Sequence, residues 1–372
     1  MHLSELKLVN FKNCDSAELQ FVPKLNCFVG LNGAGKTNVL DAIYYLSFCK
    51  SFFNAADKLN IKHGQDFFAI HGMYCTAEKP AELVACVQKR DAKKSFKHNK
   101  KEYERLSDHI GKYPLVMVSP YDRDLINDGS EQRRRFIDMV ISQFDALYLE
   151  TLIKYNKVLA QRNEQLKRFQ VSRTFDRELL QIWEQQQVDC AETIFNKRKE
   201  FLGDFLPIFQ RFHDVVSDGG EKVDIEYCSS LSAKSLVLQL EETLMRDRES
   251  GYTGVGIHKD DLMFSIDGHP LKKFGSQGQQ KSFVVALRLA QFEYSYHRMG
   301  YKPILLFDDI FDKLDDRRVA KLVHLVGDDH FGQVFITDTQ RSRVEYLFEN
   351  TSIQHRIFEV TKGTIQELNE NE

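Results

Sequence analysis

A glycine-rich octapeptide near the beginning of the sequence has the residue types and spacing of a phosphate-binding loop, G-x-x-x-x-G-K-[ST]. Its members are Gly30, Leu31, Asn32, Gly33, Ala34, Gly35, Lys36 and Thr37. In such a loop the glycines let backbone N–H groups turn towards phosphate oxygens, the lysine reaches the β and γ phosphates, and the last hydroxyl ligates Mg²⁺. A strand expected at 25–29 precedes the loop, and a helix expected from Lys36 follows it. This context favours a nucleotide site over the alternative, a glycine-rich turn without a ligand.

An acidic pair near the other end of the sequence is the natural partner of this loop. The four apolar residues Ile304 to Phe307 run into Asp308 and Asp309, which suits a buried strand that delivers carboxylates to a Mg²⁺ site. Asp308 would hold the metal with Thr37, and Asp309 could orient or deprotonate the attacking water. The alternative is a buried strand that ends in a solvated acidic turn. Because the two pieces of a nucleotide site must be neighbours, the residues between them must leave the domain and return to it.

A third pattern opens a long helix shortly before the acidic pair. It is Ser276-Gln277-Gly278-Gln279-Gln280. A serine and a glycine at a helix N-terminus make an anion site from backbone N–H groups, a hydroxyl and the helix dipole. The alternative is an ordinary helix cap, which Ser276 could also provide. The position of the pattern before the acidic strand favours the anion site.

The elements that would position these residues indicate an α/β protein. Strands and helices alternate near the C-terminus, which is typical of a parallel sheet with crossover connections. From about 130 to 213 there is little glycine or proline, and apolar residues recur at helical spacing. We predict a discontinuous domain of residues 1–125 plus 250–372, and an inserted helical arm of residues 126–249.

Composition limits the possible partners. Of the 372 residues, 42% are hydrophobic and 28% are charged, and the net charge is −3. With a pI of about 6.5 the chain is not basic overall, so any nucleic-acid binding must come from local patches. No apolar run is long enough to span a membrane and no leader is visible, so we expect no membrane association. Seven widely spaced cysteines without a CxxC pair predict a reducing cytoplasm rather than disulfides or a zinc site.

The order of the motifs resembles that of the ATP-binding-cassette and SMC-type ATPases, in which a signature motif precedes the acidic strand. The signature here is not the LSGGQ form usual in transporters and is similar to the form in the RecF family of bacterial recombination mediators. Other segments that resemble this family, in order, are Asn10–Asn13, Gly33–Leu40, Ser119–Asp122, Arg133–Asp138, Asn156–Lys167 and His258–Leu262. The resemblance covers nearly the whole chain. It implies an ABC/SMC-like P-loop ATPase head formed by both chain ends, with an inserted helical arm.

The resemblance also implies roles for single residues. ATP would be bound by residues 30–37, with Lys12 as a further phosphate contact. The γ-phosphate in one subunit would be capped by another subunit's Ser276, Gly278 and Gln279, which implies an ATP-dependent homodimer. Asp315, in the segment that matches the D-loop, would sense the partner's site. The implied catalytic residues are Lys36, Asp308, Asp309 and Ser276, and the implied metal ligands are Thr37 and Asp308.

The implied function is that of a weak DNA-dependent ATPase whose cofactors are ATP and Mg²⁺. It would dimerise on ATP, bind double-stranded DNA and single-strand/double-strand junctions without reading sequence, and release them on hydrolysis. Its role would be recombinational DNA repair, replication restart and the SOS response. There it would help a recombinase load at gapped DNA together with RecR and RecO.

Several positions depart from the family pattern. Phe53 stands where the family often has arginine, and Ile257 replaces a usual proline. Lys259 and Lys281 replace arginines, which keeps the charge but loses bidentate geometry. Thr337 and the two residues after it occupy the position where transporters place a switch histidine. Hydrolysis is therefore expected to be slow or to be sensed differently.

Clusters of positive charge are the candidate DNA contacts. They are Lys89 to Lys101, Arg133 to Arg135, and Lys154, Lys157, Arg162, Lys167 and Arg168. Such side chains would bind phosphates without reading sequence and with strong salt dependence. The alternative for each cluster is a solvated charged face. His258 is open between a structural and a functional histidine.

Two other functions stay open. One is the ATPase subunit of a membrane transporter, against which the unusual signature, the large arm and the missing switch histidine argue. The other is a non-hydrolysing, ATP-gated clamp on DNA. Measuring ATP hydrolysis in the presence of DNA would separate the clamp from an enzyme.

Overall fold

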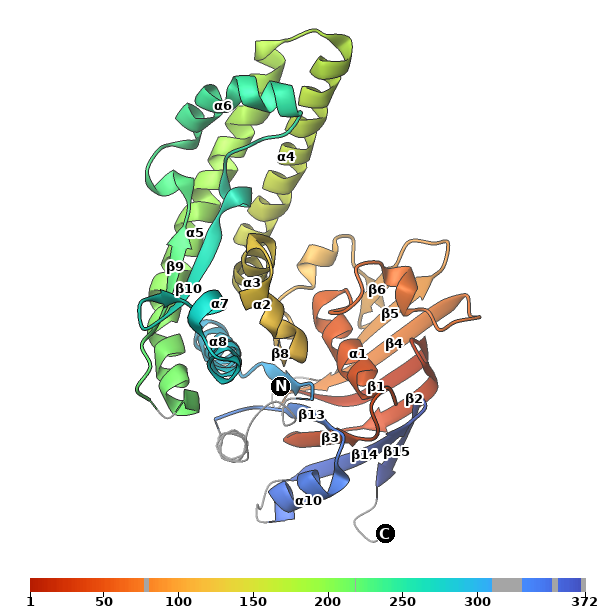
Figure 1. Ribbon diagram of the computed structural model, residues 1–372. Helices are drawn as coiled ribbons and strands as arrows, with labels where there is room; N and C mark the ends of the chain where they lie inside the picture. The colour runs from red at the N-terminus through yellow and green to blue at the C-terminus, as the bar shows by residue number, and fades with distance from the viewer. Residues whose placement is uncertain (77–79, 218, 310–329, 350–353, 369–372) are drawn as a thin grey trace. The chain divides into compact units, whose positions relative to one another are not determined.

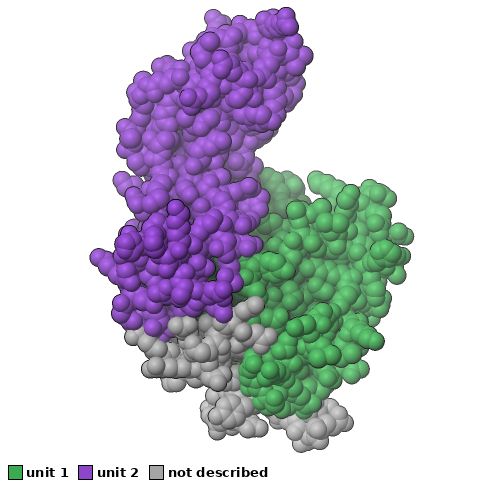
Figure 2. All heavy atoms as spheres, in the orientation of Figure 1, with its two compact units in different colours: residues 1–122, 284–372 green, residues 123–283 purple. Residues whose placement is uncertain are grey.

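The structure is a computed structural model that describes residues 1–76, 80–217, 219–309, 330–349 and 354–368. Its contacts divide the chain into two compact units, which Figure 2 colours separately. Unit 1 consists of residues 1–122 and 284–372, and unit 2 of residues 123–283. The second boundary differs from the expected one near 250. Residues 250–283 group with unit 2 because the strand at Asp261–Ile266 pairs along its length with the strand at Val223–Cys228.

Unit 1 contains an antiparallel sheet from the N-terminal part of the chain, in the order β2-β1-β4-β5-β6-β7 (Figure 1). Its strands are β1 (His2–Phe11), β2 (Cys14–Gln20), β4 (Phe67–Cys75), β5 (Glu82–Lys89), β6 (Ser95–His98) and β7 (Lys101–Glu102). Along β5, buried Val84 and Cys86 alternate with more exposed residues. This period of two is expected for a strand with one face on a core.

A second sheet of unit 1 positions the candidate site, in the order β15-β14-β3-β13-β12-β8. Its strands are β3 (Leu25–Val29), β8 (Leu115–Val118), β12 (Ile304–Phe307), β13 (Val334–Asp338), β14 (His355–Thr361) and β15 (Thr364–Leu368). All neighbouring pairs from β14 to β8 are parallel, and β14 pairs antiparallel with β15. Every residue of β3, β8, β12 and β13 is buried, as is typical of parallel strands covered on both faces. This explains why β8 and β12 read as continuous apolar runs in the sequence.

Helices connect the strands of unit 1. Helix α1 (Lys36–Phe48) begins at the end of the loop that follows β3, and α10 (Arg341–Glu349) follows β13. Helix α8 (Gln277–Met299) is continuous, and its residues from Val284 onwards belong to unit 1. Short 3-10 helices are η1 (Asp57–Asn60), η2 (Leu106–Asp108) and η3 (Pro120–Arg123). The sequence also predicts a helix at 316–326, and these residues lie outside those that the structure describes.

Unit 2 is built on a helical hairpin. Helices α4 (Ala146–Ser172) and α5 (Arg177–Ser217) lie side by side, and α3 (Ser130–Ser142) and α6 (Leu236–Ser250) pack against both (Figure 1). The buried residues Phe201, Phe205 and Phe209 step by four along α5, which confirms the apolar helical spacing. Strands β9 (Val223–Cys228), β10 (Asp261–Ile266) and β11 (His269–Pro270) form an antiparallel sheet in the order β11-β10-β9. The short helices are α2 (Asp124–Asn127), α7 (Leu271–Phe274), η4 (Ser230–Ser232) and η5 (Ile257–Lys259).

Candidate nucleotide-binding site

The loop between β3 and α1 has a backbone that requires glycine. Gly30 and Gly35 have φ angles of 155° and 119°, a region that residues with a side chain rarely adopt. Space is also short, because a Cβ atom at Gly30 would lie 2.3 Å from the carbonyl oxygen of Val360. At Gly35 it would lie 2.7 Å from the side-chain nitrogen of Asn13. Both the backbone conformation and the close approach of neighbouring atoms therefore require glycine at positions 30 and 35.

Lys36 begins α1 and turns back over the loop. Its Nζ atom donates to the carbonyl oxygens of Gly30 at 2.9 Å and Leu31 at 3.3 Å. The same atom lies 3.9 Å from Oδ1 of Asp309, and the side chain is only 4% exposed. The ammonium group is thus held inside the loop, next to one carboxylate of the acidic pair.

Asp308, directly after β12, meets Thr37 at the start of α1. Oγ1 of Thr37 donates to Oδ1 of Asp308 at 2.8 Å. Burial raises the pKa of the Asp308 carboxyl to about 6, and hydrogen bonds from Thr37 and Thr337 oppose that rise. A hydroxyl oxygen and a carboxylate oxygen side by side are hard ligands of the kind that Mg²⁺ takes in P-loop ATPases. The donor set of this site therefore fits the expected metal.

Thr337 also contacts the acidic pair, a role that the sequence analysis missed. Its hydroxyl donates to Oδ1 of Asp308 at 3.0 Å and accepts the backbone N–H of Asp309 at 2.8 Å. Strand β13 brings Thr337 there because it lies between β3 and β12 in the sheet. In the sequence, Thr337 is notable only because transporters carry a histidine in this segment. Its contact with the acidic pair depends on the strand order, which a single sequence does not give.

Asn13 is a second residue that the sequence analysis did not assign to the site. Its side-chain nitrogen donates to the carbonyl oxygen of Ala34 at 3.0 Å, and its oxygen accepts from Asn38 at 2.7 Å. The backbone N–H of Gly363 also donates to the Ala34 carbonyl, at 2.8 Å. The turn after β1 and the turn after β14 thus both fix the backbone of the loop. The Asn10–Asn13 resemblance was the signal that could have pointed to Asn13.

Lys12, the expected additional phosphate contact, forms an ion pair with a residue of α1. Its Nζ atom lies 2.6 Å from Oδ2 of the fully buried Asp41, and 5.0 Å from the ring centre of Phe53. Asp41 also accepts from the Ser51 hydroxyl and the Phe52 backbone N–H, at 2.6 Å and 2.7 Å. A phosphate contact by Lys12 remains a prediction, and would compete with this ion pair.

The signature residues of unit 2 form a capping box at the start of α8. The backbone N–H of Gln279 donates to the Ser276 hydroxyl at 3.2 Å, and the Gln279 side chain accepts from the Ser276 N–H at 2.7 Å. Ser276 remains exposed, and Gly278 follows in the first turn. The cap interpretation is therefore confirmed for Ser276, while its role towards a phosphate stays a prediction. The expected D-loop, with Asp315, lies outside the described residues.

Two of the three consecutive arginines expected to contact DNA are engaged inside unit 2. Arg133 makes a bidentate contact with Asp261, with distances of 2.7 Å and 3.0 Å. Arg134 donates to the carbonyl oxygen of Asp260 at 2.6 Å. Only the third, Arg135, is exposed at this position of α3. The first two join α3 to the segment at the start of β10, and a DNA contact by this cluster stays a prediction.

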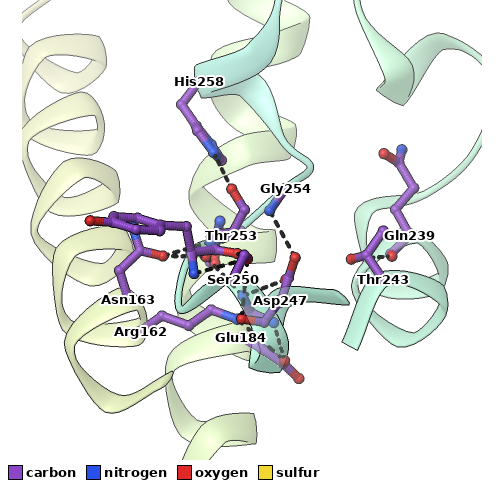
Figure 3. Close-up of polar contacts among 12 residues, drawn as sticks. Arg162, Asn163, Glu184, Gln239, Thr243, Asp247, Ser250, Thr253, Gly254 and His258 are labelled. Atoms are coloured by element: carbon purple, nitrogen blue, oxygen red, sulfur yellow. Dashed lines mark hydrogen bonds and ion pairs between the residues drawn. The ribbon is translucent and has the colours of Figure 1, made fainter. Parts of the chain in front are cut away.

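Arg162 is the clearest correction to the candidate DNA contacts, because it lies at the centre of a buried polar network (Figure 3). Its Nη1 atom donates to Asp247 and Thr253, each at 2.8 Å. Its Nη2 atom donates to Glu184 at 2.9 Å. The side chain is fully buried, so it ties α4, α5 and α6 together and is not available to DNA.

His258 is a structural histidine. Its Nδ1 atom lies 2.7 Å from the Tyr155 hydroxyl and its Nε2 atom 3.1 Å from the Thr253 carbonyl oxygen (Figure 3 shows the second contact). Burial lowers the pKa of the imidazole to about 4, so the ring is neutral at pH 7. With Nε2–H donating to the carbonyl, Nδ1 accepts from the tyrosine, and both ring nitrogens are used within unit 2.

A buried arginine, which was not predicted from the sequence, contacts two of the segments that resemble the RecF family. Arg198 of α5 makes a bidentate contact with Asp138, with both distances at 3.0 Å, and donates to Asp260, also at 3.0 Å. Tyr227 donates to the same oxygen of Asp260 at 2.5 Å. Segments 133–138 and 258–262 therefore each supply a carboxylate that binds Arg198 inside unit 2.

The lysines of the β5–β7 region remain at the surface. Those that are exposed, together with one arginine, are Lys89, Arg90, Lys93, Lys97, Lys100 and Lys101. We call these six residues the hairpin patch. Lys94 does not belong to it, because its Nζ atom contacts Asp57 at 2.7 Å and the Cys49 carbonyl at 2.6 Å. In unit 2, Lys154, Lys157, Lys167 and Arg168 are all exposed. Lys167 also lies over the Tyr252 ring, and Arg168 pairs with Glu164.

Fold and site together define a class of protein. A phosphate-binding loop after β3, an acidic pair after β12 and an intervening β13 in a parallel sheet are the site of an ABC/SMC-like P-loop ATPase. A model of the family described as RecF/RecN/SMC N terminal domain matches residues 2–366. Solved structures of Smc head domains from Pyrococcus furiosus and Pyrococcus yayanosii share the fold, with TM-scores of 0.58 and 0.56 at 15% and 14% identity.

More similar relatives narrow the class. The chain is 52% identical over 358 residues to the DNA replication and repair protein RecF of Flavobacterium johnsoniae, covering 96% of this chain and 99% of that one. It is 49% identical to RecF of Phocaeicola vulgatus over 100% of this chain and 99% of the other. A solved structure of the recombination mediator protein RecF-ATP in the RecFOR pathway has a TM-score of 0.90 at 28% identity, covering 99% of this chain and 98% of the other. The chain belongs to the RecF family.

The described part of the chain contains no membrane-spanning helix and no cluster of metal-binding side chains. None of its helices combines the length and the apolar character needed to cross a membrane. Among the same residues there is no group of three or more histidine, cysteine or acidic side chains arranged to hold a metal ion. The metal expected at Asp308 would instead be held partly by phosphates and by the Thr37 hydroxyl.

Proposed function

We propose that this chain binds ATP with Mg²⁺ in unit 1, dimerises in the ATP-bound form, and hydrolyses ATP slowly while it acts on DNA in recombinational repair. The observation that carries the proposal is the contact of Thr37 with Asp308, because it joins the two halves of a P-loop ATPase site. The RecF family membership supports the repair role, and the RecF-ATP structure of a relative supports ATP as the nucleotide.

The residues of the site suit phosphoryl transfer to water. Lys36 would neutralise charge on the β and γ phosphates, and backbone N–H groups of residues 30–35 would bind their oxygens. Thr37 and Asp308 would hold Mg²⁺, which when bound offsets negative charge on the phosphates. Asp309 would orient the attacking water and accept its proton.

The signature residues 276–280 support the proposal that a second copy of the chain completes the site. Ser276 is exposed at the N-terminus of the long helix α8, where its hydroxyl and the first backbone N–H groups could meet a phosphate from outside the chain. We propose that ATP joins two copies in this way, and that hydrolysis separates them.

DNA binding is proposed for the hairpin patch. Six cationic side chains are exposed there within residues 89–101, and contacts of this kind bind the DNA backbone irrespective of sequence. Double-stranded DNA and single-strand/double-strand junctions are the proposed targets. By family membership, RecR and RecO are the proposed protein partners in the loading of a recombinase at gapped DNA and in the SOS response.

Sizing the protein in solution tests the proposal. We expect a monomer with ADP, a dimer with ATP, and a dimer on DNA with ATP and gapped duplex. Lys36→Met should stay monomeric because it binds ATP weakly, and Ser276→Arg should bind ATP but stay monomeric. A wild-type protein that binds ATP and remains monomeric would contradict the dimer. Dimers that form without any ATP turnover on DNA would instead identify a non-hydrolysing clamp.

A further inference from the structure

The acidic pair depends on a third side chain from the strand beside it. Phe307 of β12 pairs with Ile336 of β13, so the next residues lie opposite each other: Asp308, directly after β12, and Thr337, the last but one residue of β13. Thr337 is fully buried, and its hydroxyl is within hydrogen-bond distance of both members of the pair. Its single proton goes to Asp308 and its oxygen accepts from the N–H of Asp309. The hydroxyl therefore has no proton left for a phosphate oxygen.

The first effect of Thr337 is on Asp308. Oδ1 of this carboxylate accepts two hydroxyl groups, Thr37 at 2.8 Å and Thr337 at 3.0 Å. Neither of these two bonds involves Oδ2. Thr37 itself belongs to the expected metal site, so Thr337 is the partner that fixes the orientation of the carboxylate independently of the metal. Partners of this kind orient metal ligands and tune their affinity.

The second effect is on Asp309. This residue has a φ of 43°, a left-handed conformation that residues other than glycine adopt at an energetic cost and that is common at functional sites. Its N–H is held by the Thr337 hydroxyl at 2.8 Å. The strained backbone sets the direction of the Asp309 side chain, whose Oδ1 lies 3.9 Å from the ammonium group of Lys36.

We propose that Thr337 is a positioning residue for ATP hydrolysis, one hydroxyl that fixes both the metal-binding carboxylate of Asp308 and the backbone of Asp309. Transporters carry a switch histidine in the segment that matches residues 337–339, whereas Thr337 acts here on the acidic pair and not on the γ-phosphate. The inference rests on the proposed ATPase activity of this site.

A set of three substitutions separates the hydroxyl from simple packing. Thr337→Val keeps the shape and removes the hydroxyl, Thr337→Ser keeps the hydroxyl and removes the methyl group, and Thr337→Ala removes both. We expect Val and Ala to lower kcat at least about tenfold with little change in KM, and Ser to retain most of the wild-type kcat. Serine and alanine form the matched pair if the valine variant does not fold.

Binding gives a second readout that does not need turnover. With a fluorescent ATP analogue, the Mg²⁺ concentration for half-maximal enhancement of binding should rise about tenfold or more in Thr337→Val and Thr337→Ala. Affinity in EDTA should stay at the wild-type value in all variants. If valine and alanine match the wild type in both kcat and Mg²⁺ requirement, or if serine loses as much as alanine, the proposal is overturned. A wild-type protein that binds no nucleotide would instead overturn the proposed function, and this inference with it.

Discussion

The hydroxyl of Thr37 donates to the carboxylate of Asp308 at 2.8 Å, although the two residues stand near opposite ends of the sequence. This one hydrogen bond joins helix α1 to the end of strand β12 and places two oxygen ligands together. Removing either partner should therefore affect the same property, the Mg²⁺-dependent part of nucleotide binding.

The stability of the protein should depend on pH through Asp308. Burial raises the pKa of this carboxyl from 3.8 to about 6, so the folded protein holds the proton more tightly than the unfolded chain. The resulting stability is present below about pH 4 and is lost as the pH rises through about 6. The Asp308→Asn side chain cannot ionise. The unfolding free energy of this variant, relative to that of the wild type, should therefore rise by about 1 kcal/mol from pH 5 to pH 7.5. Urea unfolding without nucleotide or Mg²⁺ measures this, and an equal difference at both pH values would count against it.

Asn13→Ala should weaken ATP binding without touching a phosphate. The substitution removes the bond to the Ala34 carbonyl and the bond from Asn38, which leaves the loop less fixed. We expect the Kd for ATP to rise about fivefold, the size of one ordinary hydrogen bond. Fluorescence titration with and without Mg²⁺ measures this, and both conditions should change alike. An unchanged Kd in a folded variant would show that the turn after β14 suffices to hold the loop.

Arg162→Met should destabilise unit 2 by about 3–5 kcal/mol, because Asp247 would be left buried without its cation and Glu184 would keep only Arg177. DNA affinity of the folded variant should not change. Lys157→Met is the matched control, since Lys157 is exposed on the same helix, and it should cost less than about 0.5 kcal/mol. Urea unfolding and DNA titration at two salt concentrations measure both effects. Loss of DNA affinity by Arg162→Met at full stability would restore this residue as a DNA contact.

The hairpin patch should contribute to the salt dependence of DNA binding. Combining Lys97→Gln, Lys100→Gln and Lys101→Gln should lower the slope of log affinity against log salt by up to about three, irrespective of DNA sequence. Lys58→Gln, an exposed lysine of η1, is the control and should leave the slope nearly unchanged. The measurement is a salt series with double-stranded and gapped DNA in the presence of ATP. A slope equal to that of the wild type would move the DNA site away from β5–β7.

Much of the site was predictable from the sequence because its chemistry is local. Residues 30–37 form a phosphate-binding loop through their own backbone, so the glycine positions, Lys36 and Thr37 could be assigned without a fold. The apolar run Ile304 to Phe307 predicted a buried strand for the same reason, since parallel strands carry apolar residues on both faces. Ser276 likewise predicted the start of a helix, and its capping box with Gln279 is present.

The charged residues show where such reasoning stops. Lys94, Arg133 and Arg162 looked like surface cations in the sequence, and each has its partner far along the chain, in Asp57, Asp261 and Asp247. Whether a positive charge faces solvent or a buried carboxylate depends on which helix or strand packs beside it. Periodicity along one element does not contain that information.

The sequence by itself therefore determined the kind of chemistry, through short motifs whose geometry is set by neighbouring residues. Only the tertiary structure decided which distant groups complete it. The order β3-β13-β12 brings Thr37, Thr337 and Asp308 to one edge, because strand pairing joins segments by backbone hydrogen bonds that any sequence can make. Thr337 became part of the site through its place in the sheet, and that place follows from how the two ends of the chain fold together.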